Sequence, residues 1–181
     1  MSTPARIVHT HAQSQLDHID LRIVEELQRD ARLTNVELSQ RVHLSPSPCL
    51  TRVRALEQAG VIDRYVALAA PRALGLTVCA FIHVTLDRQV DKALEVFEHS
   101  IRSRSEILEC YLMTGDHDYV MRVVVQDVEE LQHFIVNELS RIPGVANIHS
   151  SLALKAVKYE TALPVEHGAS LTSSKAARAR Y

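Results

Sequence analysis

The sequence predicts an α+β protein in which a helical N-terminal segment precedes a segment that alternates strands and helices. Two patterns indicate this class. Before residue 60, apolar residues recur every three or four positions, as in a helix, whereas several later runs are rich in β-branched residues. Pro71 and Gly75 lie between the two patterns and mark a boundary. With 181 residues and 46% hydrophobic composition, the chain can form two small domains with packed cores.

The first two helices are predicted from apolar spacing and from a capping motif. Helical spacing is seen from Leu16 onward, through Ile19, Ile23, Val24 and Leu27. A second, short helix opens at Thr34, because Thr34 and Glu37 have the spacing of a capping box. We expect it to run to about Val42.

The third helix is predicted to begin at Ser45. The Ser45 hydroxyl can accept a hydrogen bond from a free backbone N–H, and Pro46 follows where its missing N–H costs nothing. Gly60 suits the left-handed conformation that ends many helices. At 100° per residue, one face carries Cys49, Val53 and Leu56, flanked by Leu50 and Ala59, and the opposite face carries Ser47, Thr51, Arg54 and Gln58.

The second and third helices are joined by three residues, His43-Leu44-Ser45, which is the connection length of a DNA-binding helix-turn-helix. Arg54 can reach guanine or phosphate, Thr51 can contact base edges, and Arg52 at the edge of the face suits a phosphate. The backbone N–H groups near Ser45 and Ser47 also suit a phosphate. The pattern alone equally allows a plain helical hairpin. The candidate DNA-binding residues are Ser45, Ser47, Thr51, Arg52, Arg54 and Gln58.

The remaining elements follow in the order β-α-β-β-α-β, which is the ferredoxin-like arrangement. The expected strands are 77–86, 107–114, 119–126 and 145–157, and the expected helices are 90–101 and 128–141. A further strand is expected at 63–68. The hydrophobic content of residues 79–84 predicts that the uncovered sheet face is apolar and covered by a second copy of the chain.

These elements suggest five regions. We expect a mobile arm over 1–15, a helix-turn-helix domain over 16–68, a hinge over 69–76, a ferredoxin-like domain over 77–163 and a flexible tail over 164–181. The start of the chain lacks the apolar core of a signal peptide, and no run is long enough to span a membrane. We therefore expect a cytoplasmic protein. Three separated cysteines predict neither a disulfide nor a metal framework, and the net charge of −2 allows a locally cationic face.

Two motifs closely resemble those of the Lrp/AsnC, or feast/famine, family of bacterial transcription regulators. The first is LDHIDLRIVEELQRDARLTNVELSQRVHLSPSPCLTRVRALEQAGVIDRYVAL, and the second is MTGDHDY followed by the strand VMRVVV. Together they cover about Leu16 to Leu163 in the family's order. His43 departs from the glycine usual in the turn, and Ser39 stands where alanine is frequent.

The resemblance implies a sequence-specific DNA-binding transcription regulator whose assembly and DNA binding respond to a small effector, an amino acid or related metabolite. It also implies a homo-oligomer, with dimers associating into tetramers or octamers. From the residues we expect neither a cofactor nor a metal. In the family the glycine-acid turn lines the effector pocket between subunits. The implied effector-binding residues are Met113, Thr114, Gly115, Asp116, Asp118 and Tyr119.

Four alternatives remain open from the residues. The turn can be a plain hairpin with its acids facing water. His117 between Asp116 and Asp118 is the one constellation that suggests an enzyme, which we do not expect, and ten scattered histidines prompt the idea of a metal sensor. The chain can also be an amino-acid-binding regulatory module that acts on partner proteins without binding DNA.

Overall fold

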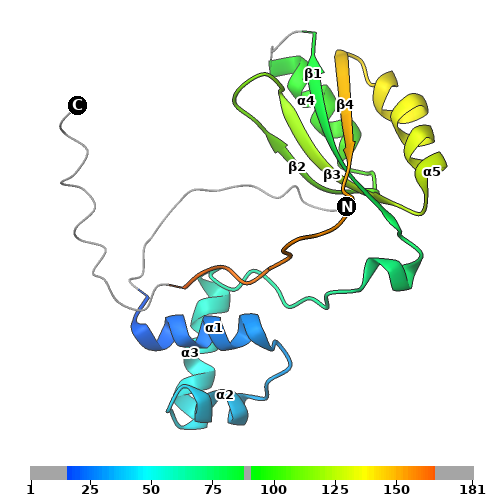
Figure 1. Ribbon diagram of the computed structural model, residues 1–181. Coiled ribbons are helices and arrows are strands. Elements are labelled where there is room, and N and C mark those ends of the chain that lie inside the picture. Colours follow the sequence, from blue (N-terminus) through cyan, green and yellow to red (C-terminus); the bar gives the residue numbers. More distant parts are fainter. Residues whose placement is uncertain (1–15, 88–90, 166–181) are drawn as a thin grey trace, which may run out of the picture. The chain divides into compact units, whose positions relative to one another are not determined.

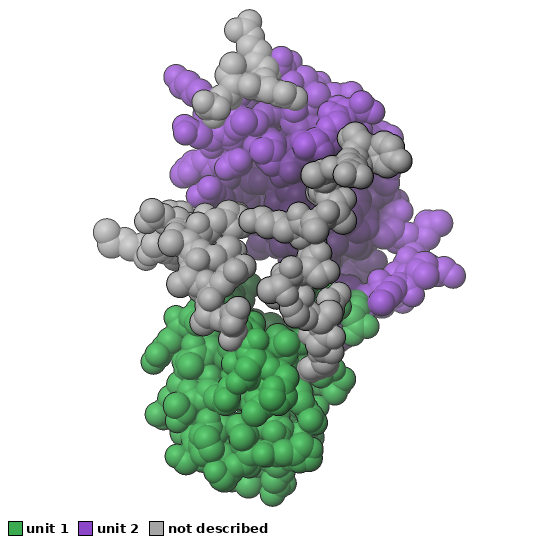
Figure 2. Space-filling model, turned by 90° about the vertical axis from the view of Figure 1, so that its left-hand side faces the viewer, with its two compact units in different colours: residues 1–67, 160–181 green, residues 68–159 purple. Residues whose placement is uncertain are grey.

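The computed structural model describes residues 16–87 and 91–165 (Figure 1). The arm expected over 1–15, and the expected tail from residue 166 onward, lie outside these residues. Internal contacts divide the chain at 67/68 and at 159/160 into two compact units (Figure 2). We call them the helix unit, which holds α1 to α3, and the sheet unit, which holds β1 to β4.

Three helices build the helix unit: α1 (His18–Arg29), α2 (Asn35–Arg41) and α3 (Pro46–Gln58). The capping box predicted at Thr34 and Glu37 is present, and Asp17 and Asp20 form a second one at the start of α1. Burial of apolar side chains holds the three helices together. The buried core consists of Ile23, Leu38, Val42, Cys49 and Leu56.

Just beyond the end of both α2 and α3 lies a residue with a left-handed backbone. Gly60 has φ 69° and His43 has φ 57°, so histidine here adopts the conformation that glycine accepts more easily. After each helix the backbone closes a Schellman-type bond: the Leu44 N–H donates to the Ser39 carbonyl at 2.8 Å, and Val61 donates to Leu56 at 2.9 Å. The three-residue turn between α2 and α3 is thereby held by backbone bonds.

The start of α3 differs from the prediction. Ser45 is the N-cap residue, but its side chain makes no capping hydrogen bond. A capping side chain accepts from the N–H of the second or third helical residue. Pro48 in the third position has no N–H to donate, which leaves the Ser47 N–H as the remaining possible donor. The helix therefore begins where the sequence indicates, without the hydroxyl cap.

The sheet unit confirms the β-α-β-β-α-β order. Its four strands form one antiparallel sheet in the order β2-β3-β1-β4. Between Val128 and Arg141 the chain stays helical but changes from an α-helix to a π-helical and then a 3₁₀ turn. The elements are β1 (Val78–Leu86), α4 (Asp91–Ile101), β2 (Ile107–Leu112), β3 (Tyr119–Val125), α5 (Val128–His133) and β4 (Val145–Leu152).

Both helices of this unit pack on one face of the sheet. The core joins alternate residues of the strands, such as Ile82 and Met121, to Phe97 of α4 and Phe134 of α5. The opposite face is more polar than predicted, because Arg122 and several histidines lie among the apolar side chains of β1 and β3. Only part of that face is therefore apolar.

Two expected strands differ in the structure. Residues 63–68 form no strand, because no other described strand pairs with them, and an extended segment needs a ladder partner. Strand β4 ends at Leu152 rather than 157, since its last pair is with Ala80 near the start of β1. The expected hinge contains a short 3₁₀ helix, Pro71–Leu74, closed by Gly75 at φ 78°.

Candidate nucleic-acid interface and effector site

The outer face of α3 is exposed, as the helical spacing predicts. Ser47, Thr51, Arg54 and Gln58 are all exposed, as is Ser45. The Thr51 hydroxyl donates to the Ser47 carbonyl at 3.2 Å, a weak bond that DNA can replace. Arg54 makes no hydrogen bond or ion pair with any residue that the structure describes, so its guanidinium is available for phosphate or a base edge.

The N-terminus of α3 offers fewer backbone donors than an ordinary helix. Pro46 and Pro48 carry no N–H, so Ser47 supplies the remaining donor among the first three helical residues. Anion binding at a helix start depends on several such donors. A phosphate at this end of α3 would therefore depend on Ser47 and on the adjacent hydroxyl groups.

The sequence predicts a phosphate contact for Arg52, but in the structure its side chain bonds to two carboxylates of its own chain. Its Nη1 atom donates to Asp17 Oδ2 and to Asp20 Oδ1, each at 2.7 Å. The hydrogen bond from the Asp20 backbone N–H, and then the Arg52 guanidinium, lower the pKa of Asp17. The same two carboxylates, Asp20 first, raise the pKa of Arg52. Arg52 thus belongs to an ion-pair cluster that joins α3 to the first turn of α1.

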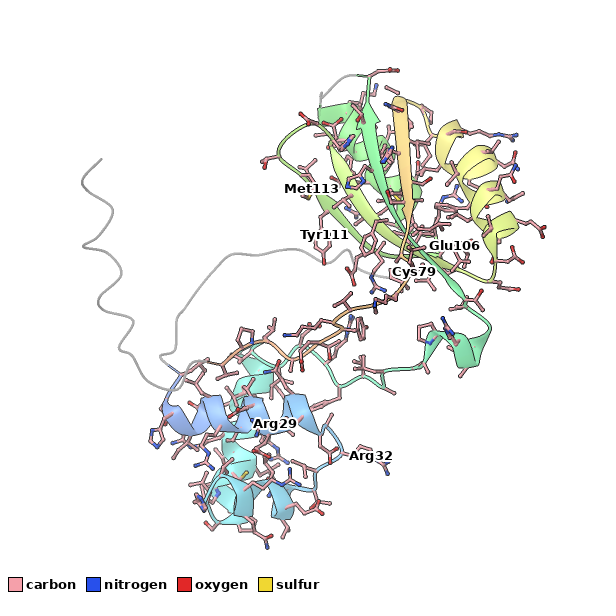
Figure 3. The ribbon with its side chains drawn as sticks, in the orientation of Figure 1. Arg29, Arg32, Cys79, Glu106, Tyr111 and Met113 are labelled. Carbon is pink, nitrogen blue, oxygen red and sulfur yellow. The ribbon has the colours of Figure 1, made fainter. Side chains whose placement is uncertain are left out.

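After β2 the chain enters the glycine-acid turn, which is exposed. It returns to the sheet at Asp118. Met113, Thr114, Gly115 and Asp116 are exposed, and Gly115 has φ 118°. Figure 3 shows Met113 on the β2 side of the sheet. The Met113 N–H donates to the Asp118 carbonyl at 2.8 Å and closes the turn.

The last two predicted effector residues are buried. Asp118 is 5% exposed, and its Oδ2 accepts the Leu86 N–H at 2.7 Å, so its carboxylate fixes the turn to the end of β1. Tyr119 stacks on Phe97 with ring centroids 4.6 Å apart, and its hydroxyl donates to Glu98 at 3.1 Å. Burial and then Glu98 raise the pKa of Tyr119. Asp116 is therefore the predicted acid that a ligand can approach most easily.

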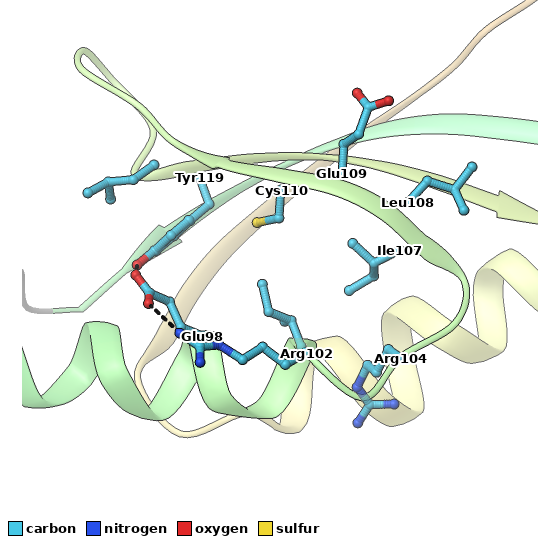
Figure 4. Close-up of a pocket in the computed structure, with 10 residues that line it drawn as sticks. Glu98, Arg102, Arg104, Ile107, Leu108, Glu109, Cys110 and Tyr119 are labelled. Carbon is cyan, nitrogen blue, oxygen red and sulfur yellow. Dashed lines mark hydrogen bonds and ion pairs between the residues drawn. The ribbon is translucent and has the colours of Figure 1, made fainter. Parts of the chain in front are cut away.

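A cleft of about 350 Å³ lies between α4 and β2 (Figure 4). Among the predicted effector residues it contains only Tyr119. The sequence analysis does not select the other residues of this cleft. Glu98 on α4 and Arg102, just after its end, are four positions apart and form an ion pair at 3.6 Å. Burial and then Glu98 raise the pKa of Cys110 to about 11. The lining is Glu98, Ile101, Arg102, Arg104, Ile107, Leu108, Glu109, Cys110, Leu112 and Tyr119.

The histidine of the turn contacts a hydroxyl and another ring. His117 Nδ1 lies 3.3 Å from Thr85 Oγ1, and its ring centroid is 5.0 Å from that of His83. Within the described ranges, no group of three histidine, cysteine or acidic side chains is arranged to hold a metal ion. None of the helices described here is long and apolar enough to cross a bilayer.

Comparison with known proteins covers both units. Residues 16–63 match the family model "Winged helix-turn-helix DNA-binding", and residues 79–163 match "Lrp/AsnC ligand binding domain". The chain is 40% identical over 151 residues to the leucine-responsive regulatory proteins of Escherichia coli K12 and Klebsiella pneumoniae. Each alignment spans 83% of this chain and 92% of the relative.

Solved structures show the same similarity. Transcriptional regulator NMB0573 of Neisseria meningitidis, solved as an L-Met complex, has a TM-score of 0.81 and 43% identity, covering 84% of this chain and 98% of that one. Escherichia coli AsnC has a TM-score of 0.74 and 27% identity, covering 80% of this chain and 96% of its own. These matches extend across both units.

Proposed function

This chain belongs to the Lrp/AsnC family of transcription regulators, and from that premise we propose how its own residues perform the function. It is a DNA-binding transcription regulator that responds to an amino acid effector. We propose that α3 enters the major groove and that Thr51 and Arg54 make the principal contacts. The observation that carries this proposal is the exposed face of α3, on which Arg54 has no partner among the described residues.

The DNA-binding proposal is tested with the double variant Thr51→Ala and Arg54→Ala. We expect it to lose binding to a duplex from the region upstream of the protein's own coding sequence, measured by fluorescence anisotropy. Sedimentation velocity on the same samples shows whether assembly is retained. Unchanged DNA binding would refute the assignment of α3 and would favour an amino-acid-binding module that acts on partner proteins.

We propose that the effector binds at the exposed turn of residues 113–116, with Asp116 placed to pair with an α-ammonium group. The L-Met complex of the Neisseria regulator makes L-Met the first probe, followed by the other amino acids. We expect Asp116→Ala to abolish the ligand-induced thermal shift without lowering the melting temperature of the free protein. A retained shift would exclude Asp116 from the site. Asp118 is unsuitable for this test, because its removal leaves the Leu86 N–H without its acceptor.

We propose that a second copy of the chain covers the uncovered sheet face, giving a dimer that can associate further into tetramers or octamers. Phe81 and Tyr111 support this, because they are 42% and 56% exposed on that face. We expect Phe81→Asp to shift the mass measured by light scattering toward the monomer. An unchanged mass would place the contact elsewhere. A regulator of this kind acts where the DNA is, so we propose a cytoplasmic location.

A further inference from the structure

We propose that Arg52 is a positioning residue that fixes the rotation of α3 about its own axis, rather than a residue that contacts DNA. This inference rests on the proposed role of α3 in DNA binding. It explains why an arginine beside the outer face of a DNA-reading helix points its guanidinium toward two carboxylates of its own chain.

Helix α3 packs through two buried residues, Cys49 and Leu56, and Val53 between them is partly buried. These positions form one narrow line along the helix, at i, i+4 and i+7. A narrow apolar line fixes where a helix lies but resists its rotation only weakly, because non-directional contacts tolerate small rotations.

An ion-pair cluster lies beside that line. Arg52 projects from the flank of α3 and donates from one nitrogen to Asp17 and Asp20 at 2.7 Å each. These bonds are directional and lie off the apolar line, so they oppose rotation of α3 against α1. The side chains of Arg52, Asp17 and Asp20 are 33%, 43% and 18% exposed, so water screens the cluster only in part.

The first turn of α1 does not need Arg52 to form. Asp17 Oδ1 accepts the backbone N–H groups of Ile19 and Asp20, each at 2.9 Å, and Asp20 Oδ2 accepts the Asp17 N–H at 3.2 Å. The oxygens that meet Arg52 are the two left over, Asp17 Oδ2 and Asp20 Oδ1. Replacing Arg52 therefore removes the connection between the helices and leaves the capping box intact.

Arg54 is the matched control, because it lies two residues further on the same helix, is exposed and has no partner in the described part of the chain. A phosphate contact releases counterions, so its loss reduces the slope of log K against log salt concentration by about one unit. A positioning residue changes the affinity and leaves that slope unchanged. We expect Arg54→Gln to reduce the slope and Arg52→Gln to weaken binding about five-fold with the wild-type slope.

Asp20, one of the two carboxylates that bind Arg52, allows a second test that separates positioning from DNA contact. Removing a carboxylate from a DNA-binding surface strengthens DNA binding through reduced repulsion. We expect Asp20→Asn to weaken binding instead, by about the same factor as Arg52→Gln, and the double variant to be no weaker than either single variant. Asp63→Asn is the control, because Asp63 is 87% exposed in its side chain, and it should bind DNA as well as or better than wild type.

The experiment measures binding of the intact protein to the upstream duplex over a range of salt concentrations, with circular dichroism to show that each variant is folded. A reduced slope for Arg52→Gln, stronger binding for Asp20→Asn, or additive losses would each overturn the inference. Hydrogen exchange gives a reading without DNA: amides of α3 should exchange faster in Arg52→Gln and not in Arg54→Gln. Unchanged exchange in Arg52→Gln would also overturn the inference. If every variant, Arg54→Gln included, binds DNA as tightly as wild type, that result counts against the proposed function instead.

Discussion

At the scale of single residues, His43 and Gly60 adopt the same left-handed backbone conformation with different side chains. Each lies just after a helix of the helix unit, with φ 57° and 69° respectively, and each is followed by a backbone bond back to the helix. A left-handed backbone costs a residue with a Cβ roughly 1–2 kcal/mol, whereas glycine adopts it freely. The histidine at position 43 therefore destabilises the turn that sets the angle between α2 and α3.

We predict that His43→Gly stabilises the helix unit. Relief of the backbone cost exceeds the extra entropy that glycine has in the unfolded chain, for a net gain of about 0.5 kcal/mol. Gly60→Ala should destabilise the unit by about 1 kcal/mol, because alanine pays the cost of the left-handed backbone. Steric overlap adds nothing to this cost, because no atom lies within 4 Å of the added Cβ. Urea denaturation followed by circular dichroism measures both. A loss of stability in His43→Gly would show that the imidazole makes a stabilising interaction.

At the scale of whole elements, the helices of the helix unit begin in two ways. α1 and α2 each begin with a capping box, and α3 begins with prolines and no side-chain cap. Carboxylates in the two boxes bind backbone N–H groups in the charged form. The Thr34 backbone N–H, followed by its hydroxyl, lowers the pKa of Glu37, and the Asp20 N–H leads the causes that lower the pKa of Asp17.

These pKa shifts predict that acid weakens the helix unit. A carboxyl group with a lowered pKa in the folded state contributes stability above its ordinary value, 4.5 for Glu37 and 3.8 for Asp17. That contribution is lost as the pH falls through the folded pKa. We expect Glu37→Gln, which keeps the cap geometry, to lose less stability than wild type between pH 5 and pH 3, in urea melts followed by circular dichroism.

Glu95→Gln is the control for that measurement. Glu95 is exposed on α4, and its carboxylate makes no hydrogen bond or ion pair with the described residues. Its replacement should leave the acid-dependent loss as in wild type. An equal change in both variants would mean that general charge repulsion, rather than the capping box, causes the acid sensitivity.

At the scale of the whole molecule, the described residues form two separate cores. One surrounds Ile23 in the helix unit and the other surrounds Phe97 in the sheet unit, and both side chains are fully buried. The chain passes from the sheet unit back to the helix unit after residue 159. There Gln28 holds Leu163 by two bonds, donating to its carbonyl at 3.1 Å and accepting its N–H at 2.6 Å. Residues 160–165 therefore belong to the helix unit.

We predict that core substitutions act within their own unit. Phe97→Ala should cost the sheet unit about 3–5 kcal/mol, and Ile23→Ala should cost the helix unit about 2–5 kcal/mol, through lost burial and the cavity left behind. Hydrogen exchange resolved by peptide should show faster exchange only in the unit that carries the change. Faster exchange in both units from either substitution would show that the two cores unfold as one.

Local patterns in the sequence predict the class of fold, the order of its elements and the outer face of α3. Those features depend on local periods, caps and turn residues, which act over a few positions: Thr34 with Glu37, or Gly60 at a helix end. The resemblance of the two motifs supplied the family, which the comparisons confirmed.

Contacts between polar groups that are distant in sequence depend on the tertiary structure. Arg52 bonds to carboxylates that are 32 and 35 positions away in the sequence. Asp118 accepts a hydrogen bond from the Leu86 N–H, 32 positions away. Residues 63–68 have the composition of a strand but no described strand to pair with. In each case the outcome depends on a partner distant in sequence, because hydrogen bonds and ion pairs act over a few ångströms and only the fold brings such partners that close.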